Sequence, residues 1–302
     1  MIVWGGESYD GVVHYWNTGG RYNPNTDSWT ATSTTNAPDG RYFHAAVWTG
    51  SEMIVWGGSN PGLLNTGGRY NPSTDSWTAT STTNAPTPRE YHTAVWTGSE
   101  MIVWGGSDEF NLLDSGGRYN PSSDSWTATS RNNVPYARSG HTAVWTGAAM
   151  IVWAGIDDFG DTLNTGGSYD PTSDSWAATN TTNAPDPRTN PTSVWTGTEM
   201  IVWGGASGQL LNNGGKYNPG TNSWTASSTT GAPSSRYGHT AIWTGSEMIV
   251  WGGDDPLNSN TGGRYCAQSG PTPTPTPCTG RCGPTPRPRP TPHPRPMPAQ
   301  LR

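Results

Sequence analysis

Leucine, isoleucine and lysine are scarce in this 302-residue sequence, in which 31% of the residues are hydrophobic and 13% are charged. Because helices favour alanine, leucine, glutamate and lysine, this composition argues against a mainly helical protein. The apolar runs fall well short of the ~18 residues that a membrane-spanning helix needs. The first residues, Met1-Ile2-Val3-Trp4, show neither the basic region nor the apolar run of a secretory signal peptide.

Basic residues are also few in most of the chain. Residues 1–269 carry 11 Lys+Arg against 22 Asp+Glu, whereas residues 270–302 carry five Arg and no acid. Binding to nucleic acid depends on basic side chains that neutralise phosphates. The acidic body therefore argues against a nucleic-acid partner.

The abundant residues, glycine, tryptophan, threonine and asparagine, occur in strings that repeat along the chain. Met-Ile-Val-Trp begins at residues 1, 53, 101, 150, 200 and 248. Gly-Gly-x-Tyr, Ser-Trp and Val/Ile-Trp-Thr-Gly recur at matching offsets. Each string fits a short strand bounded by turn residues. In one unit we expect strands a, b, c and d at residues 92–96, 101–104, 117–119 and 125–129. Four strands in ~50 residues make one propeller blade.

These strings resemble the kelch-repeat family, including repeats of the kind found in the central domain of galactose oxidase. The resemblance rests on Arg-x-x-His before an apolar strand, a second apolar strand that ends in Gly-Gly, and Tyr and Trp at fixed offsets. It covers residues 1 to about 265. It implies an all-β, six-bladed kelch-type β-propeller with antiparallel blades around a central channel.

The two end blades are expected to be incomplete. The chain starts in strand b and its last recognisable strand is c, which gives 22 strands in all. Either six blades close imperfectly or an upstream segment is missing, and we favour the missing segment.

Two single residues also depart from the repeated pattern. Ala154 replaces the first glycine of one Gly-Gly pair, and Pro191 replaces a repeated histidine. Since proline cannot donate to a strand ladder, that strand a is expected to start later or to be irregular.

The composition changes at Gly270, where proline begins to alternate with threonine and arginine. We therefore expect two parts, a propeller over residues 1–269 and a disordered Pro/Thr/Arg-rich tail over residues 270–302. Cys266, Cys278 and Cys282 all lie near this end. No His or acid accompanies them at metal-site spacing, which argues against zinc. Cys278 and Cys282 are predicted to form either a small disulfide loop or a redox pair. We expect an extracellular or cell-surface location.

Most repeated residues are interpreted as part of the fold. The repeated tryptophans should pack blade against blade. The repeated arginines should bond turn carbonyls or carboxylates between blades, and the repeated Glu and Asp should serve turns. The histidines at the strand starts, His44, His92, His141 and His239, would form a metal site only if several of them converged.

Function is expected in the b–c loops, where the units differ. These loops span residues 7–18, 59–66, 107–115, 156–165, 206–213 and 254–261, and they contain ten acids and no Lys or Arg. The candidate ligand-binding residues are Tyr15, Trp16, Asp108, Glu109, Phe110, Asp157, Asp158, Asp161, Asp254 and Asp255. Carboxylates and aromatics suit a sugar, a basic protein or calcium, for which Asp157, Asp158 and Asp161 offer oxygen ligands. No other cofactor and no catalytic residue is assigned.

The sequence thus predicts a non-catalytic binding module with a glycan or protein ligand on its acidic b–c loop face. A structural surface scaffold without a discrete ligand is the alternative. An enzyme is a further alternative. The copper site of a galactose-oxidase-like enzyme cannot be assembled, because every cysteine lies at the C-terminal end. A sugar mutarotase would need only acid–base groups at the channel mouth.

Overall fold

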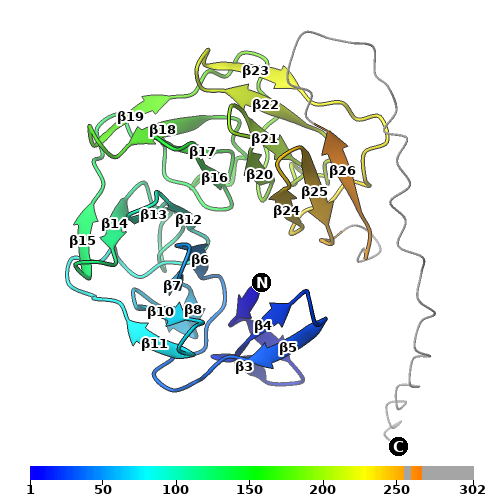
Figure 1. Ribbon diagram of the computed structural model, residues 1–302. Helices are drawn as coiled ribbons and strands as arrows, with labels where there is room; N and C mark the ends of the chain where they lie inside the picture. Colours follow the sequence, from blue (N-terminus) through cyan, green and yellow to red (C-terminus); the bar gives the residue numbers. More distant parts are fainter. Residues whose placement is uncertain (255–259, 267–302) are drawn as a thin grey trace, which may run out of the picture. The chain divides into compact units, whose positions relative to one another are not determined.

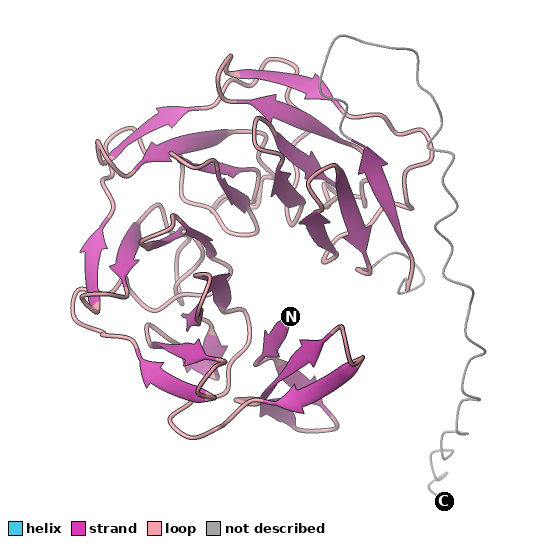
Figure 2. Cartoon of the chain, in the orientation of Figure 1, coloured by secondary structure: helices cyan, strands magenta, loops and turns pink. Residues whose placement is uncertain are grey.

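The computed structural model describes residues 1–254 and 260–266, within the compact unit Met1–Ala267. Its regular elements are all strands (Figures 1 and 2), and this described part contains no helix that could span a membrane. The predicted tail, with Cys278 and Cys282, and the candidate residue Asp255 lie outside the described residues.

The strands form six successive antiparallel sheets, which are the six predicted blades. Blade 1 contains β1 (Ile2–Trp4), β4 (Gly19–Asn23) and β5 (Ser28–Ala31). Blade 2 contains β6 (Ala45–Trp48), β7 (Met53–Trp56), β10 (Gly67–Asn71) and β11 (Ser76–Ala79). Blade 3 contains β12 (Thr93–Trp96), β13 (Met101–Trp104), β14 (Gly116–Asn120) and β15 (Ser125–Ala128).

Blade 4 contains β16 (Thr142–Trp145), β17 (Met150–Trp153), β18 (Gly166–Asp170) and β19 (Ser175–Ala178). Blade 5 contains β20 (Thr192–Trp195), β21 (Met200–Trp203), β22 (Gly214–Asn218) and β23 (Ser223–Ala226). Blade 6 contains β24 (Thr240–Trp243), β25 (Glu247–Trp251) and β26 (Gly262–Cys266). The six-bladed fold is confirmed, and blades 1 and 6 each have three strands among the described residues. Two short hairpins, β2 (Glu7–Tyr9) with β3 (Val13–Tyr15) and β8 (Ser59–Asn60) with β9 (Gly62–Leu63), were expected to be plain loop.

Neighbouring blades pack through their tryptophans, as predicted. Trp56 on strand b of blade 2 is fully buried between two rings of blade 3. His92 meets it edge-on, with ring centroids 5.4 Å apart, and Trp126 on strand d lies 5.2 Å away. Trp4 and Trp104 lie between the equivalent rings of the next blade. Burial of these large rings stabilises the contact between neighbouring blades.

Hydrogen bonds align each blade with the next. Between blades 2 and 3, Trp126 Nε1 donates to the Ser81 carbonyl at 2.9 Å, and the Ser81 amide donates to Asp124 Oδ1 at 2.9 Å. Arg69 of blade 2 also donates to the Pro121 carbonyl of blade 3 at 2.6 Å. The repeated aspartates before strand d therefore join two blades as well as serving their own turns.

The repeated arginines bond within their own blade, so the prediction of side-chain bonds between blades is wrong. Arg138 is fully buried, and its guanidinium donates to the carbonyls of Tyr136, Ala154 and Thr165 at 2.8–3.0 Å. Tyr136 lies in the segment that precedes strand a of blade 4, and Ala154 and Thr165 lie at the two ends of its b–c loop. The arginine backbone supplies the contact between blades, because the Arg138 carbonyl accepts from the Gly106 amide of blade 3.

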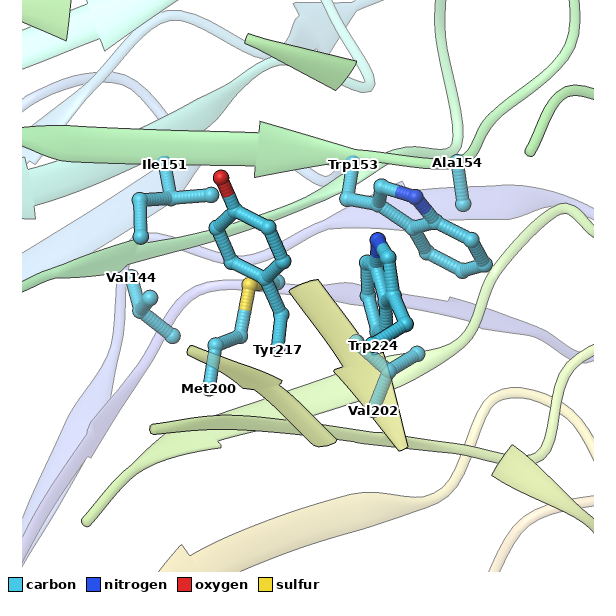
Figure 3. Close-up of a cluster of buried hydrophobic side chains, with 8 residues drawn as sticks. All are labelled: Val144, Ile151, Trp153, Ala154, Met200, Val202, Tyr217 and Trp224. Carbon is cyan, nitrogen blue, oxygen red and sulfur yellow. The ribbon is translucent and has the colours of Figure 1, made fainter. Parts of the chain in front are cut away.

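The interface between blades 4 and 5 differs from the others (Figure 3). Here Trp153 faces Trp224 at 4.8 Å, and Ala154 is buried beside them. Pro191 replaces the histidine, yet β20 begins at Thr192, the same position as in the other blades. The expectation of a late or irregular strand is wrong because proline precedes the first paired residue and lies outside the ladder. Ser193 Oγ bonds to Thr142 Oγ1 of blade 4 at 2.5 Å.

The outer surfaces of the two end blades have no described neighbour. The blades follow one another around an arc, with blade 1 and blade 6 at its ends. Trp29 of blade 1 is 54% exposed and Trp251 of blade 6 is 59% exposed, whereas their counterparts inside the arc are buried. Each end blade is therefore stabilised by only one neighbour.

Acidification is expected to destabilise the propeller through its buried histidines. Burial, reinforced by Arg89 and Arg138, lowers the pKa of His92 and of His141 from 6.5 to about 3. Below pH 6.5 the unfolded chain binds more protons than the folded chain. The free energy of unfolding should therefore fall between pH 6.5 and 3, by ~1.4 kcal/mol per pH unit for each of these histidines. Urea titrations at pH 7 to 4 measure the slope. His141→Gln should reduce it by ~1.4 kcal/mol per pH unit, and an unchanged slope would contradict this origin.

Candidate functional site

The b–c loops lie beside the segment that precedes strand a of the same blade. In each unit, the first of the two residues that follow the repeated Arg pairs with the start of the b–c loop through a single antiparallel bridge. These bridges are Tyr42–Ser59, Glu90–Ser107, Ser139–Ile156, Thr189–Ala206 and Tyr237–Asp254. We call the surface formed by the b–c loops and both of these residues in each unit the loop face. It comprises the predicted ligand-binding loops together with positions that sequence reasoning did not consider.

Four aromatic rings form a continuous row on the loop face of blades 1 to 3. Tyr15 stacks on Tyr42 with ring centroids 5.5 Å apart, Tyr42 lies 4.5 Å from Phe43, and Phe43 lies 4.1 Å from Tyr91. Phe43 and Tyr91 remain 43% and 41% exposed. We call these four residues the aromatic row. A cluster of exposed aromatic rings offers a flat, polarisable surface to a ligand.

Backbone strain accompanies the row. Phe43 and Tyr91 have φ of +53° and +54°, a region that bulky side chains rarely adopt. Blades 4 and 6 have Gly140 and Gly238 at this position, where the left-handed conformation costs little. Strain retained at exposed residues is a recognised sign of a functional site.

Carboxylates flank the aromatic row. Burial raises the pKa of Tyr91 to about 12, and the nearby Glu90, Tyr42 and Glu7 add to this effect. Partial burial also raises the pKa of Glu90. The row therefore lies in a region of negative potential that favours a cationic ligand group, because cations are attracted both to ring faces and to carboxylates.

The predicted residue Trp16 lies next to the row on the β2–β3 hairpin. Its ring stacks on His14 at 5.9 Å, its Nε1 donates to Ser8 Oγ at 2.9 Å, and it is partly exposed. His14 Nε2 contacts Asp10 Oδ1 at 3.1 Å. The hairpin thus holds Tyr15 and Trp16 on one short element at the edge of the row.

The predicted acids of blades 3 and 4 support their own loops. Asp108 Oδ1 accepts the amides of Phe110 and Asn111, and Asp157 Oδ1 accepts those of Phe159 and Asp161. Asp158 Oδ1 accepts the Leu112 amide and links the two loops at 2.9 Å. Glu109 is exposed beside Phe110. Phe110 and Phe159 extend almost fully into solvent, at 85% and 91% exposure.

The described residues contain no group of three or more His, Cys, Asp or Glu side chains that could hold a metal ion. Asp157, Asp158 and Asp161, proposed above as calcium ligands, do not form such a group. The repeated histidines are separated in the same way, each beside a tryptophan of the preceding blade. In blade 6, a hydrogen bond to Asp254 raises the pKa of Tyr237.

The opposite face has a different charge pattern. Basic residues on strand c pair there with glutamates of the a–b hairpin, including Arg118–Glu100 at 3.9 Å and Lys216–Glu199 at 3.7 Å. On the loop face the repeated arginines are buried, and exposed Arg131 is paired with Asp114 at 2.6 Å. The uncompensated charge of the loop face is therefore negative.

Sequence reasoning identified Tyr15 and Trp16 but missed Tyr42, Phe43, Glu90 and Tyr91. The available signal was the variation inside a fixed motif, because the two residues between Arg and His differ in every unit. They read Tyr-Phe, Glu-Tyr, Ser-Gly, Thr-Asn and Tyr-Gly along the chain.

Comparison with known families agrees with this architecture. The family model described as Attractin/LZTR1 beta-propeller, a kelch-type propeller family, matches residues 60–269. No curated protein matches the chain. The match covers more than half of the sequence and includes blades 3 to 6 in full. The chain therefore belongs to the Attractin/LZTR1 family of kelch-type β-propellers.

Proposed function

We propose that this propeller is a non-catalytic protein-interaction module that binds a basic segment of a partner protein on the loop face of blades 1 to 3. The observation that carries the proposal is the aromatic row, with Phe43 and Tyr91 exposed and strained beside Glu7 and Glu90. An arginine or lysine side chain can lie over the rings and pair with the carboxylates. Kelch-type propellers of this family are generally protein-interaction modules.

Geometry supports a short segment as the ligand. The four rings offer a continuous contact surface across the first three blades. Large exposed aromatic residues typically dominate the binding energy of an interface. The acidic loops surrounding them increase the rate of encounter with a basic partner.

Replacing Tyr91 with alanine is expected to weaken partner binding about tenfold or more, since it removes the terminal ring of the row. Glu90→Gln should weaken binding less and reduce its salt dependence, because it removes one charge. The full chain is first screened on an array of arginine- and lysine-containing peptides, and hits are measured by calorimetry. The exposed Tyr136, which is not part of the row, provides the control Tyr136→Ala. Equal affinities for Tyr91→Ala and Tyr136→Ala would contradict the proposed site.

A glycan is the second candidate ligand. Phe110 and Phe159 are almost fully exposed beside Glu109 and Asp158, and aromatic rings with nearby carboxylates suit a polyhydroxylated sugar. The same protein is tested on a glycan array with and without calcium. Saturable glycan binding that is lost in Phe159→Ala but kept in Tyr91→Ala would favour this candidate over the basic segment.

A further inference from the structure

The backbone beside the aromatic row is already hydrogen-bonded within the propeller. Tyr42 donates its amide to the Ser59 carbonyl at 3.2 Å and accepts the Ser59 amide at 3.0 Å. Glu90 and Ser107 exchange the same two bonds at 3.1 and 2.9 Å. A ligand on the row therefore cannot add as a further strand at these residues, and it must be recognised by side chains.

The tyrosine hydroxyls of the row differ from those of the repeated tyrosines on strand c. The repeated tyrosines use their hydroxyls inside the blade, as Tyr119 does in donating to Asp124 at 2.7 Å. Within the part of the chain that the structure describes, no hydrogen bond is made by the hydroxyls of Tyr15, Tyr42 and Tyr91. Burial raises the pKa of Tyr91 to about 12, so its hydroxyl keeps its proton at neutral pH. The row thus offers hydroxyl donors as well as ring faces.

Rings with hydroxyl donors suit a ligand in the polyproline II conformation. Such a helix has no internal hydrogen bonds, so its carbonyls accept bonds from outside. Its prolines have no N–H group that would need an acceptor, and aromatic-lined surfaces are the usual docking sites for segments of this kind. The ring-to-ring steps of the row are 5.5, 4.5 and 4.1 Å, which gives room for about four residues that rise about 3.1 Å each.

We infer that the ligand of the aromatic row is a proline- and arginine-rich segment of a partner protein, bound as a polyproline II helix. This inference rests on the function proposed above, because it specifies the ligand of the same site. Proline rings pack on Tyr15 and Phe43. The hydroxyls of Tyr42 and Tyr91 donate to carbonyls of the segment. An arginine lies over a ring and pairs with Glu90, which a planar guanidinium does better than an ammonium group.

The probe is a synthetic peptide with the sequence of residues 284–296, Pro-Thr-Pro-Arg-Pro-Arg-Pro-Thr-Pro-His-Pro-Arg-Pro. It carries a fluorophore at its N-terminus, and its binding to the full chain is measured by fluorescence anisotropy. Two matched peptides replace every proline with alanine or every arginine with glutamine. Because these changes are confined to the peptide, loss of folding cannot produce a difference between them.

We expect each altered peptide to bind at least about tenfold more weakly than the probe. Tyr91→Phe should weaken binding of the probe by about threefold or more, since it removes one hydroxyl donor and keeps the ring. Phe43 occupies the same position in the preceding unit, so the repeat accommodates phenylalanine there. Tyr136→Phe is the control, because Tyr136 is exposed and lies outside the row.

Equal affinities for the probe and its alanine counterpart would overturn the polyproline II ligand and leave the basic segment proposed above. Unchanged affinity in Tyr91→Phe would contradict the hydroxyl contact on which the inference depends. Absence of probe binding at ~1 mM peptide would overturn the inference, and failure of every arginine- and lysine-containing peptide as well would also remove the proposed function.

The chain itself contains the probe sequence, so a competing occupant is tested with the full chain carrying Arg287→Gln, Arg289→Gln and Arg295→Gln. We expect this variant to bind the probe as the unaltered chain does. Binding that is several-fold tighter would show that the chain's own segment competes for the row, which would overturn a partner protein as the occupant.

Discussion

Replacing Arg138 with methionine is expected to lower the free energy of unfolding by about 3 kcal/mol or more. Three backbone carbonyls, of Tyr136, Ala154 and Thr165, would lose their donor inside the protein, and each unpaired buried group costs ~1–3 kcal/mol. Burial lowers the pKa of Arg138 to about 10, so its guanidinium is still charged at neutral pH. Urea or thermal unfolding measures the change.

Arg138→Lys distinguishes charge from geometry. Lysine retains the charge but donates from a single ammonium group, so it cannot reach both sides of the loop as the planar guanidinium does. We expect it to be destabilising, although less so than methionine. Arg131→Met is the matched control, since Arg131 is 66% exposed and its surface ion pair with Asp114 should contribute little to stability. Equal losses for Arg138→Met and Arg131→Met would show that the buried arginines do not hold the loops.

Gly105→Ala is expected to destabilise blade 3 by ~2–4 kcal/mol. Gly105 has a φ of +70°, and an added Cβ would lie 2.6 Å from Cε1 of buried His141. In blade 4 the same position is already alanine, with a φ of +69° at Ala154. That side chain is accommodated because Pro191 replaces the histidine of the next blade. Ala154 and Pro191, the two residues that depart from the repeat, therefore compensate for each other.

A double-mutant cycle at the blade 4–blade 5 interface measures this compensation. Pro191→His alone should clash with the Ala154 side chain, whereas Pro191→His combined with Ala154→Gly restores the pair found in the other blades. We expect a favourable coupling energy of more than ~1 kcal/mol from urea unfolding of the four proteins. Additive effects would show that Ala154 and Pro191 are independent.

Much of the fold could be predicted because the same strand-forming and turn-forming strings recur in six units. Met-Ile-Val-Trp and Ser-Trp mark strands, and their spacing predicts the blades and the three strands that each end blade has in the described part of the chain. The prediction that Pro191 would delay or disturb strand a of blade 5 was wrong. The first paired residue of that strand follows the position of the repeated histidine, and composition alone does not reveal this.

The site was less predictable because it depends on distances between blades. Tyr15, Phe43 and Tyr91 come from three successive units, and only the curvature of the blades brings their rings together. Sequence reasoning selected the b–c loops because the repeated units differ there. It overlooked Tyr42 and Glu90 because they lie inside a motif that looks structural.

The exposed Trp29 and Trp251 have a consequence for cooperativity. In an array where each unit contacts only its neighbours, stability is a sum of unit terms and nearest-neighbour interface terms. Within the described residues, inner blades have two such interfaces, whereas blades 1 and 6 have one each, as the exposure of Trp29 and Trp251 indicates. Unfolding then proceeds inward from the two ends, as in a one-dimensional helix–coil chain. Amide protection should be greatest in blades 3 and 4, so the order of opening follows from position in the array even though the repeats are nearly alike in sequence.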